Sequence, residues 1–192
     1  MTFGYCVLLS GVALLCGCGA RTPSIPTGFE RQLELNGIGF HVTSPNLAAG
    51  NTVTVAPSGL EIDNSPISWD ADGAVTAAEV ADLDADGSPE VYVYVISKDA
   101  AARGSLVAYS ANKRKSLSAI YLPPMTESPA AAQGYQGHDD FAVTRDSLVR
   151  RFPLYASAAA GASPTGRTRQ LQYKLVPGEA GWLLKLDRTT DF

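Results

Sequence analysis

Hydrophobic and polar residues alternate with a period of two along most of the chain, which is the pattern of β-strands with one face toward water. In residues 170–175, and again in 182–186, every second side chain is apolar. The segment between them contains one proline and two glycines, which are turn-forming residues. The sequence therefore predicts a β-hairpin over these residues.

Other segments repeat this period. The dipeptide Asn36-Gly37, which is preferred in tight hairpin turns, separates a predicted strand at 31–35 from one at 39–42. Residues 91–96 (VYVYVI) alternate valine with tyrosine, so both faces suit burial in a central strand. Additional strands are expected at 106–110, 117–122 and 148–152.

Helical periodicity is rare in this chain. Only residues 74–80 and 127–133 could hold a helical turn or two. The 18 glycines and 12 prolines indicate frequent turns. We therefore predict an all-β fold, an antiparallel β-sandwich with one or two short helical turns, in a single domain at residues 30–192.

The composition narrows the classes of function. Of the 192 residues, 45% are hydrophobic and 18% are charged, as in a globular protein. The net charge is −4, so no basic field exists to hold a phosphate backbone, and no nucleic-acid partner is expected. Cations cluster at residues 113–115, 150–151 and 167–169, where they are either solvated or available to an acidic partner.

The N-terminal segment has the features of an export signal. All three cysteines lie in the first 18 residues, which carry no charged side chain. The apolar run at 5–15 is too short to span a bilayer. Residues 15–18 (LCGC) resemble the lipobox of bacterial lipoproteins, in which a small residue precedes the cysteine that is lipidated.

The lipobox resemblance implies a signal peptide at 1–17 and a lipidated Cys18 followed by a flexible tether at 18–29. Because no aspartate follows Cys18, it favours a periplasmic protein anchored by lipid to the outer membrane. No Lys or Arg precedes the apolar run, so an ordinary cleaved signal and a buried N-terminal helix remain as alternatives. The chain after Cys18 contains no cysteine, which excludes disulfides and thiol catalysis there.

A metal-binding pattern occurs at residues 82–90 (DLDADGSPE). Asp82, Asp84, Asp86 and Glu90 have the spacing of the ligands in Asp-rich calcium loops, with a glycine at the sharp bend. An EF-hand is excluded, because Val93 stands where that motif needs a bidentate glutamate. The loop therefore either binds calcium or forms an Asx-type turn before the next strand, and no other cofactor is expected.

Catalytic motifs are sparse. His138 lies beside two aspartates, but the only other histidine, His41, is distant in the sequence, and no nucleophile elbow of the G-x-S-x-G type occurs. One histidine without cysteine partners also does not make a typical zinc site. We interpret His138 as a turn residue that bonds to neighbouring backbone, and we expect a protein that is not an enzyme.

Several blocks, in order along the chain, resemble the periplasmic inhibitors of invertebrate-type lysozyme. The resemblance extends over roughly residues 67–186, most of the domain. Its blocks are VADLDADGSPEVYVYV at 80–95, GSLVAYS at 104–110, SLS at 116–118, GYQGHDDF at 134–141, LVRRFP at 148–153 and TRQLQYKLVPGEAGW at 168–182.

The resemblance implies a β-sandwich that blocks the cleft of an invertebrate-type lysozyme with an exposed loop. In that family the loop carries a Ser-Gly-x-Tyr type segment. The matching place here is residues 100–105, but alanine replaces the serine and Arg103 replaces the tyrosine, so that only Gly104 and Ser105 carry over. Either Arg103 binds the paired carboxylates of the lysozyme cleft, or the loop has lost its role and the scaffold serves another partner.

Overall fold

The computed structural model describes Met1 and residues 28–157, 162–179 and 181–192. Apart from Met1, the predicted signal peptide at 1–17, the lipidation site Cys18 and the tether up to residue 27 lie outside the described residues. The first strand begins at Phe29, one residue ahead of the predicted domain boundary.

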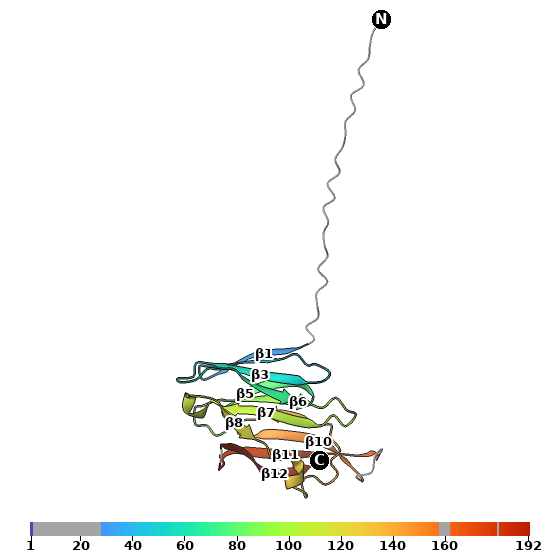
Figure 1. The fold of residues 1–192 in the computed structure, drawn as a ribbon. Coiled ribbons are helices and arrows are strands. Elements are labelled where there is room, and N and C mark those ends of the chain that lie inside the picture. The colour runs from blue at the N-terminus through green and yellow to red at the C-terminus, as the bar shows by residue number, and fades with distance from the viewer. Residues whose placement is uncertain (2–27, 158–161, 180) are drawn as a thin grey trace.

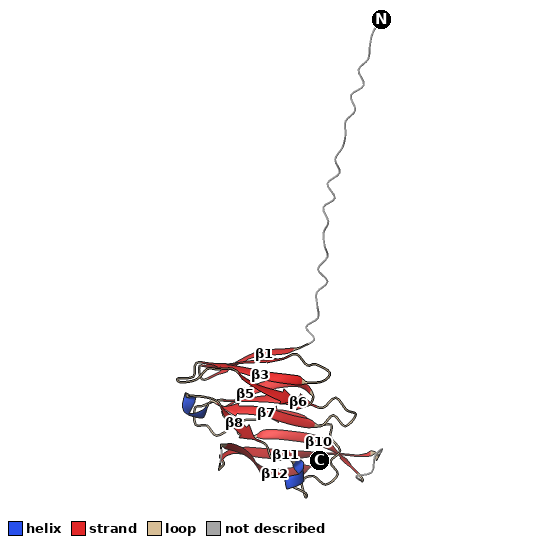
Figure 2. Ribbon diagram, viewed as in Figure 1, coloured by secondary structure: helices blue, strands red, loops and turns tan. Residues whose placement is uncertain are grey.

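Twelve strands and two short 3-10 turns are the regular elements of the described residues, which confirms the predicted all-β fold (Figure 2). The 3-10 turns are η1 (Asn112–Arg114) and η2 (Met125–Glu127). In chain order the strands are β1 (Phe29–Leu35), β2 (Ile38–Ser44), β3 (Asn51–Ser58), β4 (Ile67–Ala71), β5 (Ala74–Ala81), β6 (Glu90–Ile96), β7 (Gly104–Ser110), β8 (Ser118–Tyr121), β9 (Asp140–Val143), β10 (Leu148–Tyr155), β11 (Pro164–Pro177) and β12 (Trp182–Asp191).

The strands form two sheets. The four-stranded sheet has the order β1-β2-β3-β4, and the eight-stranded sheet has the order β5-β6-β7-β8-β12-β11-β10-β9. All pairs are antiparallel except β8 and β12, which meet in parallel through two residue pairs. Figure 1 shows three layers: the four-stranded sheet, then β5 to β8, then β10 to β12. The eight-stranded sheet therefore folds over, and the arrangement is sandwich-like with a barrel-like half.

Strand β6 contributes to two hydrophobic cores. Its valines (91, 93 and 95) pack toward β2 and β3 in the first core. The tyrosines Tyr92 and Tyr94 pack toward Phe152 and Leu171 in the second core, between the two halves of the eight-stranded sheet. The predicted burial of both faces of residues 91–96 is confirmed, because side chains on successive residues of a strand point to opposite faces.

Both predicted hairpins are present. Strands β1 and β2 pair from Phe29↔Ser44 to Leu35↔Ile38 around the turn at Asn36-Gly37, where both residues have positive φ. Strands β11 and β12 pair from Arg169↔Asp191 to Pro177↔Trp182, with one bulge near Gln172. Both strands of this second hairpin extend beyond the predicted ranges.

The helical prediction at residues 74–80 is wrong. This segment is strand β5, which pairs with β6 and buries Val75 and Ala78 in the first core. Alanine favours helices only weakly, and pairing with a fully buried strand outweighs that preference. In residues 127–133, one helical turn occurs, closed by a hydrogen bond from the Ala132 N–H to the Ser128 carbonyl. Strands β3, β4 and β9 were not predicted.

Candidate functional site

The connection between β6 and β7, residues 97–103, is an exposed loop that carries Arg103 (the β6–β7 loop). Three side chains close the loop on itself. The Ser97 hydroxyl donates to the Asp99 carboxylate over 2.7 Å and accepts from the Arg103 N–H over 2.7 Å. The Arg103 Nη1 atom lies 3.0 Å from Asp99 Oδ2, while 57% of the Arg103 side chain remains exposed. The Ser97 hydrogen bond, together with the Arg103 charge, holds the pKa of Asp99 below its usual value.

A second segment, residues 137–139, supports the β6–β7 loop from one side. The His138 N–H donates to the Ala101 carbonyl over 2.7 Å. Gly137 lies so close that a Cβ atom there would overlap the Ala101 carbonyl oxygen, and its φ is +101°. His138 is not part of a turn, and its backbone bonds to a segment distant in the sequence, while its ring stacks near the Tyr155 ring, with the centroids 6.4 Å apart.

A buried ion pair fixes the base of the loop. The Asp139 carboxylate, whose side chain is 0% exposed, accepts from the Gly104 N–H over 2.6 Å, from the Tyr135 hydroxyl over 2.6 Å and from Arg150 Nε over 2.7 Å. We call Gly104, Tyr135, Asp139 and Arg150 the Asp139 network. It joins three of the sequence blocks described above, namely GSLVAYS, GYQGHDDF and LVRRFP.

Arg150 is the cation of this network and is only 5% exposed. Its guanidinium donates to the Tyr135 hydroxyl over 2.9 Å and lies over the rings of Tyr135 and Phe141, 5.1 and 5.3 Å from their centroids. Burial alone would lower the pKa of Arg150, but the hydrogen bond and charge of Asp139 outweigh it and raise that pKa. The expectation of a solvated cation at this position is therefore wrong.

Tyr135 and Asp139 were not predicted to be functional residues, and Arg150 was named only among the cations that are either solvated or available to an acidic partner. One signal for this network was present in the sequence. Arg150 stands at the third position of the strand LVRRFP, and a charged side chain buried within an apolar strand needs a partner. Gly104, a predicted loop residue, belongs to the same network, because a Cβ atom on Gly104 would overlap the Phe141 ring and the Asp139 side chain. Ser105 is exposed and follows Gly104 on β7.

The acidic loop at residues 82–88 brings three of the four predicted metal ligands together. One carboxylate oxygen from each of Asp82, Asp84 and Asp86 lies within 4.8 Å of the others. The same carboxylates accept backbone N–H groups of the loop, among them that of Gly87. Burial, with the charge of Asp86 next, raises the pKa of Asp84. The loop therefore has the hydrogen bonds of an Asx-type turn as well as a cluster of carboxylates.

Glu90 does not belong to that cluster, which corrects the fourth predicted ligand. It is the first residue of β6, and its carboxyl group is buried, where it accepts from the Leu83 N–H over 2.9 Å and lies 3.4 Å from the Ser110 hydroxyl. Burial, with the charges of the three aspartates, raises the pKa of Glu90 to about 8. Glu90 is therefore protonated at neutral pH.

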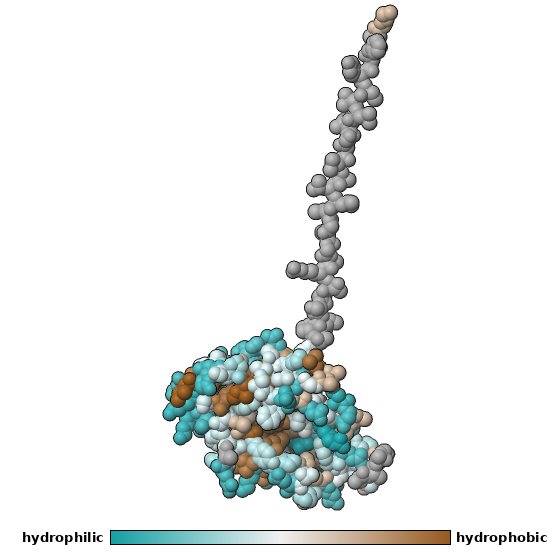
Figure 3. All heavy atoms as spheres, in the orientation of Figure 1, coloured by the Kyte–Doolittle hydropathy of each residue, from teal (hydrophilic) through white to brown (hydrophobic). Residues whose placement is uncertain are grey.

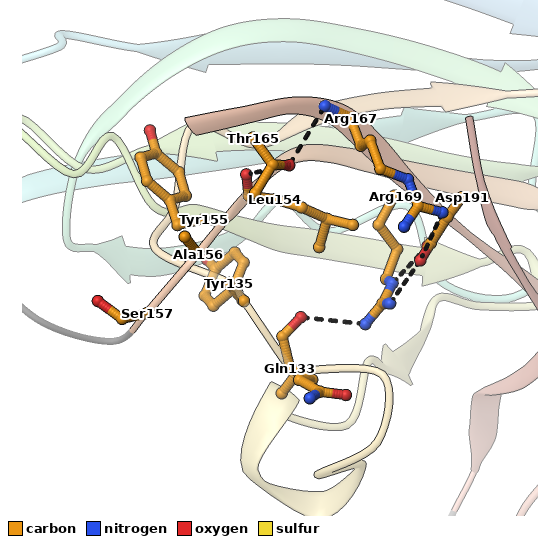
Figure 4. Close-up of a pocket in the computed structure, with 12 residues that line it drawn as sticks. Gln133, Tyr135, Leu154, Tyr155, Ala156, Ser157, Thr165, Arg167, Arg169 and Asp191 are labelled. Atoms are coloured by element: carbon orange, nitrogen blue, oxygen red, sulfur yellow. Dashed lines mark hydrogen bonds and ion pairs between the residues drawn. The ribbon is translucent and has the colours of Figure 1, made fainter. Parts of the chain in front are cut away.

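A cavity of about 720 Å³ lies beside the segment 132–135 and strands β10 and β11 (Figure 4). Arg169 crosses it, with two nitrogens 2.6 and 2.7 Å from the Asp191 carboxylate, and also donates to the carbonyls of Ala130, Ala131 and Gln133. Arg167 is exposed and lies 3.6 Å from Asp191. Because Arg169 binds both the Asp191 carboxylate and three carbonyls of the segment, it fastens the segment to the sheet, and the predicted edge cation is here a structural residue.

None of the helical turns in the described residues is long and apolar enough to cross a membrane. No protein-family model matches the chain, and no curated protein or solved structure matches it either.

Proposed function

We propose that this chain is a periplasmic lipoprotein, not an enzyme, that binds an invertebrate-type lysozyme and blocks the enzyme's cleft with the β6–β7 loop. The lipid on Cys18 would anchor it to the outer membrane. The observation that carries the proposal is the loop itself: it is exposed at its tip and held at its base by the buried Asp139 network. A loop that is already ordered loses little conformational entropy on binding.

The chemistry of Arg103, the last residue of the loop, also supports the proposal. Glycosidase clefts hold a pair of carboxyl groups, and a guanidinium binds a carboxylate through two parallel hydrogen bonds. Arg103 would exchange its ion pair with Asp99 for the carboxylates of the cleft. Since that pair is exposed, breaking it costs little. Ser105 adds an exposed hydroxyl next to Gly104, at the position where the resemblance places one.

The test is a titration of residues 19–192 against lysozymes of the invertebrate, chicken and goose types, with cell-wall lysis as the readout. The expected result is stoichiometric inhibition of the invertebrate type alone. If the protein leaves all three enzymes fully active, the proposed function is wrong.

Replacing Arg103 with alanine should weaken inhibition of the invertebrate-type lysozyme by about tenfold or more, because a charged anchor at the centre of an interface carries a large share of the affinity. The inhibition constant measures the effect. The control is Arg31→Ala, which removes an exposed arginine from β1 of the other sheet and should leave inhibition unchanged. Equal inhibition by R103A and the unaltered protein would mean that Arg103 is not an anchor.

The second candidate function is calcium binding, and the observation in its favour is the approach of the Asp82, Asp84 and Asp86 carboxylates to within 4.8 Å. A bound cation would offset the repulsion among them. Saturating calcium should then raise Tm by about 5 °C or more, while magnesium should not. Asp84→Asn should abolish the shift, and Asp187→Asn, on β12, should leave it intact. An unchanged Tm in calcium would remove this candidate.

A further inference from the structure

An open groove of about 730 Å³ is lined by residues of β4, β7, β8 and β12 and of the segments that connect the strands. Strand β8 lies between β7 and β12 in the sheet. It pairs with β7 through Ala119↔Tyr109 and Ser118↔Ser110, and its last two residues then pair with β12. Residues of all three strands line the groove. Figure 3 shows hydrophobic atoms exposed between hydrophilic ones on the face of the domain turned toward the viewer.

Four aromatic side chains are among the residues that line this groove, which we call the aromatic groove. Trp69, on β4, is 60% exposed, and Tyr121, on β8, is 53% exposed. Trp182 and Tyr109 line it as well. Large aromatic side chains in water are unfavourable, and their concentration in one concave surface is typical of a binding site.

The charged residues in the described lining are both acidic. They are Glu127, the last residue of η2, and Glu179, in the turn between β11 and β12. The Tyr121 hydroxyl donates to Glu127 over 3.0 Å, which places one carboxylate beside an exposed ring. No Lys or Arg is among the described residues that line the groove. The site is therefore aromatic, apolar and negatively charged.

We propose that the aromatic groove binds an organic cation with an apolar body, such as an alkylammonium group. The face of an aromatic ring carries negative electrostatic potential and attracts a cation, and Glu127 and Glu179 add a field of the same sign. Apolar side chains such as Leu106 and Leu183 contact the uncharged part of the ligand. The two carboxylates would repel an anion and would not favour a neutral ligand over a cation of the same shape.

This site is separate from the proposed lysozyme contact. No residue of the β6–β7 loop, nor Gly104 or Ser105, lines the aromatic groove. Cation binding and lysozyme inhibition can therefore succeed or fail independently.

The experiment uses the intrinsic fluorescence of tryptophan, because both tryptophans of the chain line the groove. The probes are choline, its uncharged isostere 3,3-dimethyl-1-butanol, and hexyltrimethylammonium, which has a longer apolar body. We expect a saturable change with choline, at least about tenfold tighter than with the alcohol, and tighter again with hexyltrimethylammonium. Binding should weaken as sodium chloride is added, because salt screens exposed charges.

Two variants test the carboxylates without removing a tryptophan. Glu127→Gln and Glu179→Gln should each weaken choline binding about three- to fivefold. The matched control, Glu34→Gln on β1, changes the net charge equally and should have no effect. Equal binding of choline and the alcohol, equal effects of all three variants, or a response to an uncharged oligosaccharide such as chitotetraose but not to ammonium would each overturn the proposal.

Discussion

Replacing Asp139 with alanine is expected to lower the free energy of unfolding by about 3–5 kcal/mol. The substitution leaves the Arg150 guanidinium buried without a countercharge. It also removes the acceptor for the Tyr135 hydroxyl and for the Gly104 N–H. Urea denaturation at pH 7, followed by circular dichroism, measures the loss.

The neighbouring residue provides the control. Asp140 is exposed at the start of β9, and Asp140→Ala should change the free energy of unfolding by less than about 0.5 kcal/mol. Asp139→Asn keeps an acceptor for part of the network and should fall between the two. If D139A were as stable as D140A, the Asp139 network would not be what holds the base of the β6–β7 loop.

Stability is expected to decrease by about 4 kcal/mol as the pH rises from about 4.5 to 8, because of Glu90. The pKa of this carboxyl group is about 8 in the folded protein, far above its ordinary value of 4.5. Below pH 4.5 both the folded and the unfolded chain carry the proton. Between the two pKa values only the unfolded chain loses it, so a rise in pH favours unfolding. Thermal unfolding in EDTA across this pH range measures the slope, and EDTA keeps divalent cations from the acidic loop.

The variant Glu90→Gln separates the pH dependence of stability caused by Glu90 from that caused by other titratable groups. The amide keeps an acceptor for the Leu83 N–H and cannot ionise. The variant should therefore lose most of the downward slope and be more stable than the unaltered protein at pH 8. Asp82, Asp84 and Asp86 are retained in it, so a slope that persists in E90Q would have to come from a group other than Glu90.

The sequence predicted those parts of the fold that depend on local pattern. Alternating residues identified both hairpins, and VYVYVI identified a strand buried on two faces, because the side-chain period of a strand is visible within six residues. Strand β5 could not be predicted in this way, because its alanine-rich sequence is ambiguous between helix and strand, and the pairing with β6 decides its secondary structure. The pairing of β8 with β12 could not be predicted from the local pattern either, because only two residue pairs make that contact.

The candidate site, too, could be predicted from the sequence only in part. The position of Arg103 in an exposed connection between two strands could be predicted from the strand pattern around it. The ion pair that holds the loop could not, because Asp139 lies 35 residues from Gly104 and meets it only when the eight-stranded sheet folds over. Glu90 has the spacing of a metal ligand, but its place as the first residue of β6 turns its carboxyl group inward. Spacing alone cannot distinguish a ligand from a buried acid.

The burial of both faces of β6 links the two cores of the domain. The valines of this strand complete one core and its tyrosines complete the other. If either core melted, β6 would be released and the opposite core would lose its central strand. We therefore expect the two cores to unfold together, and the backbone amides of β6 to exchange with solvent deuterium only when the entire domain opens.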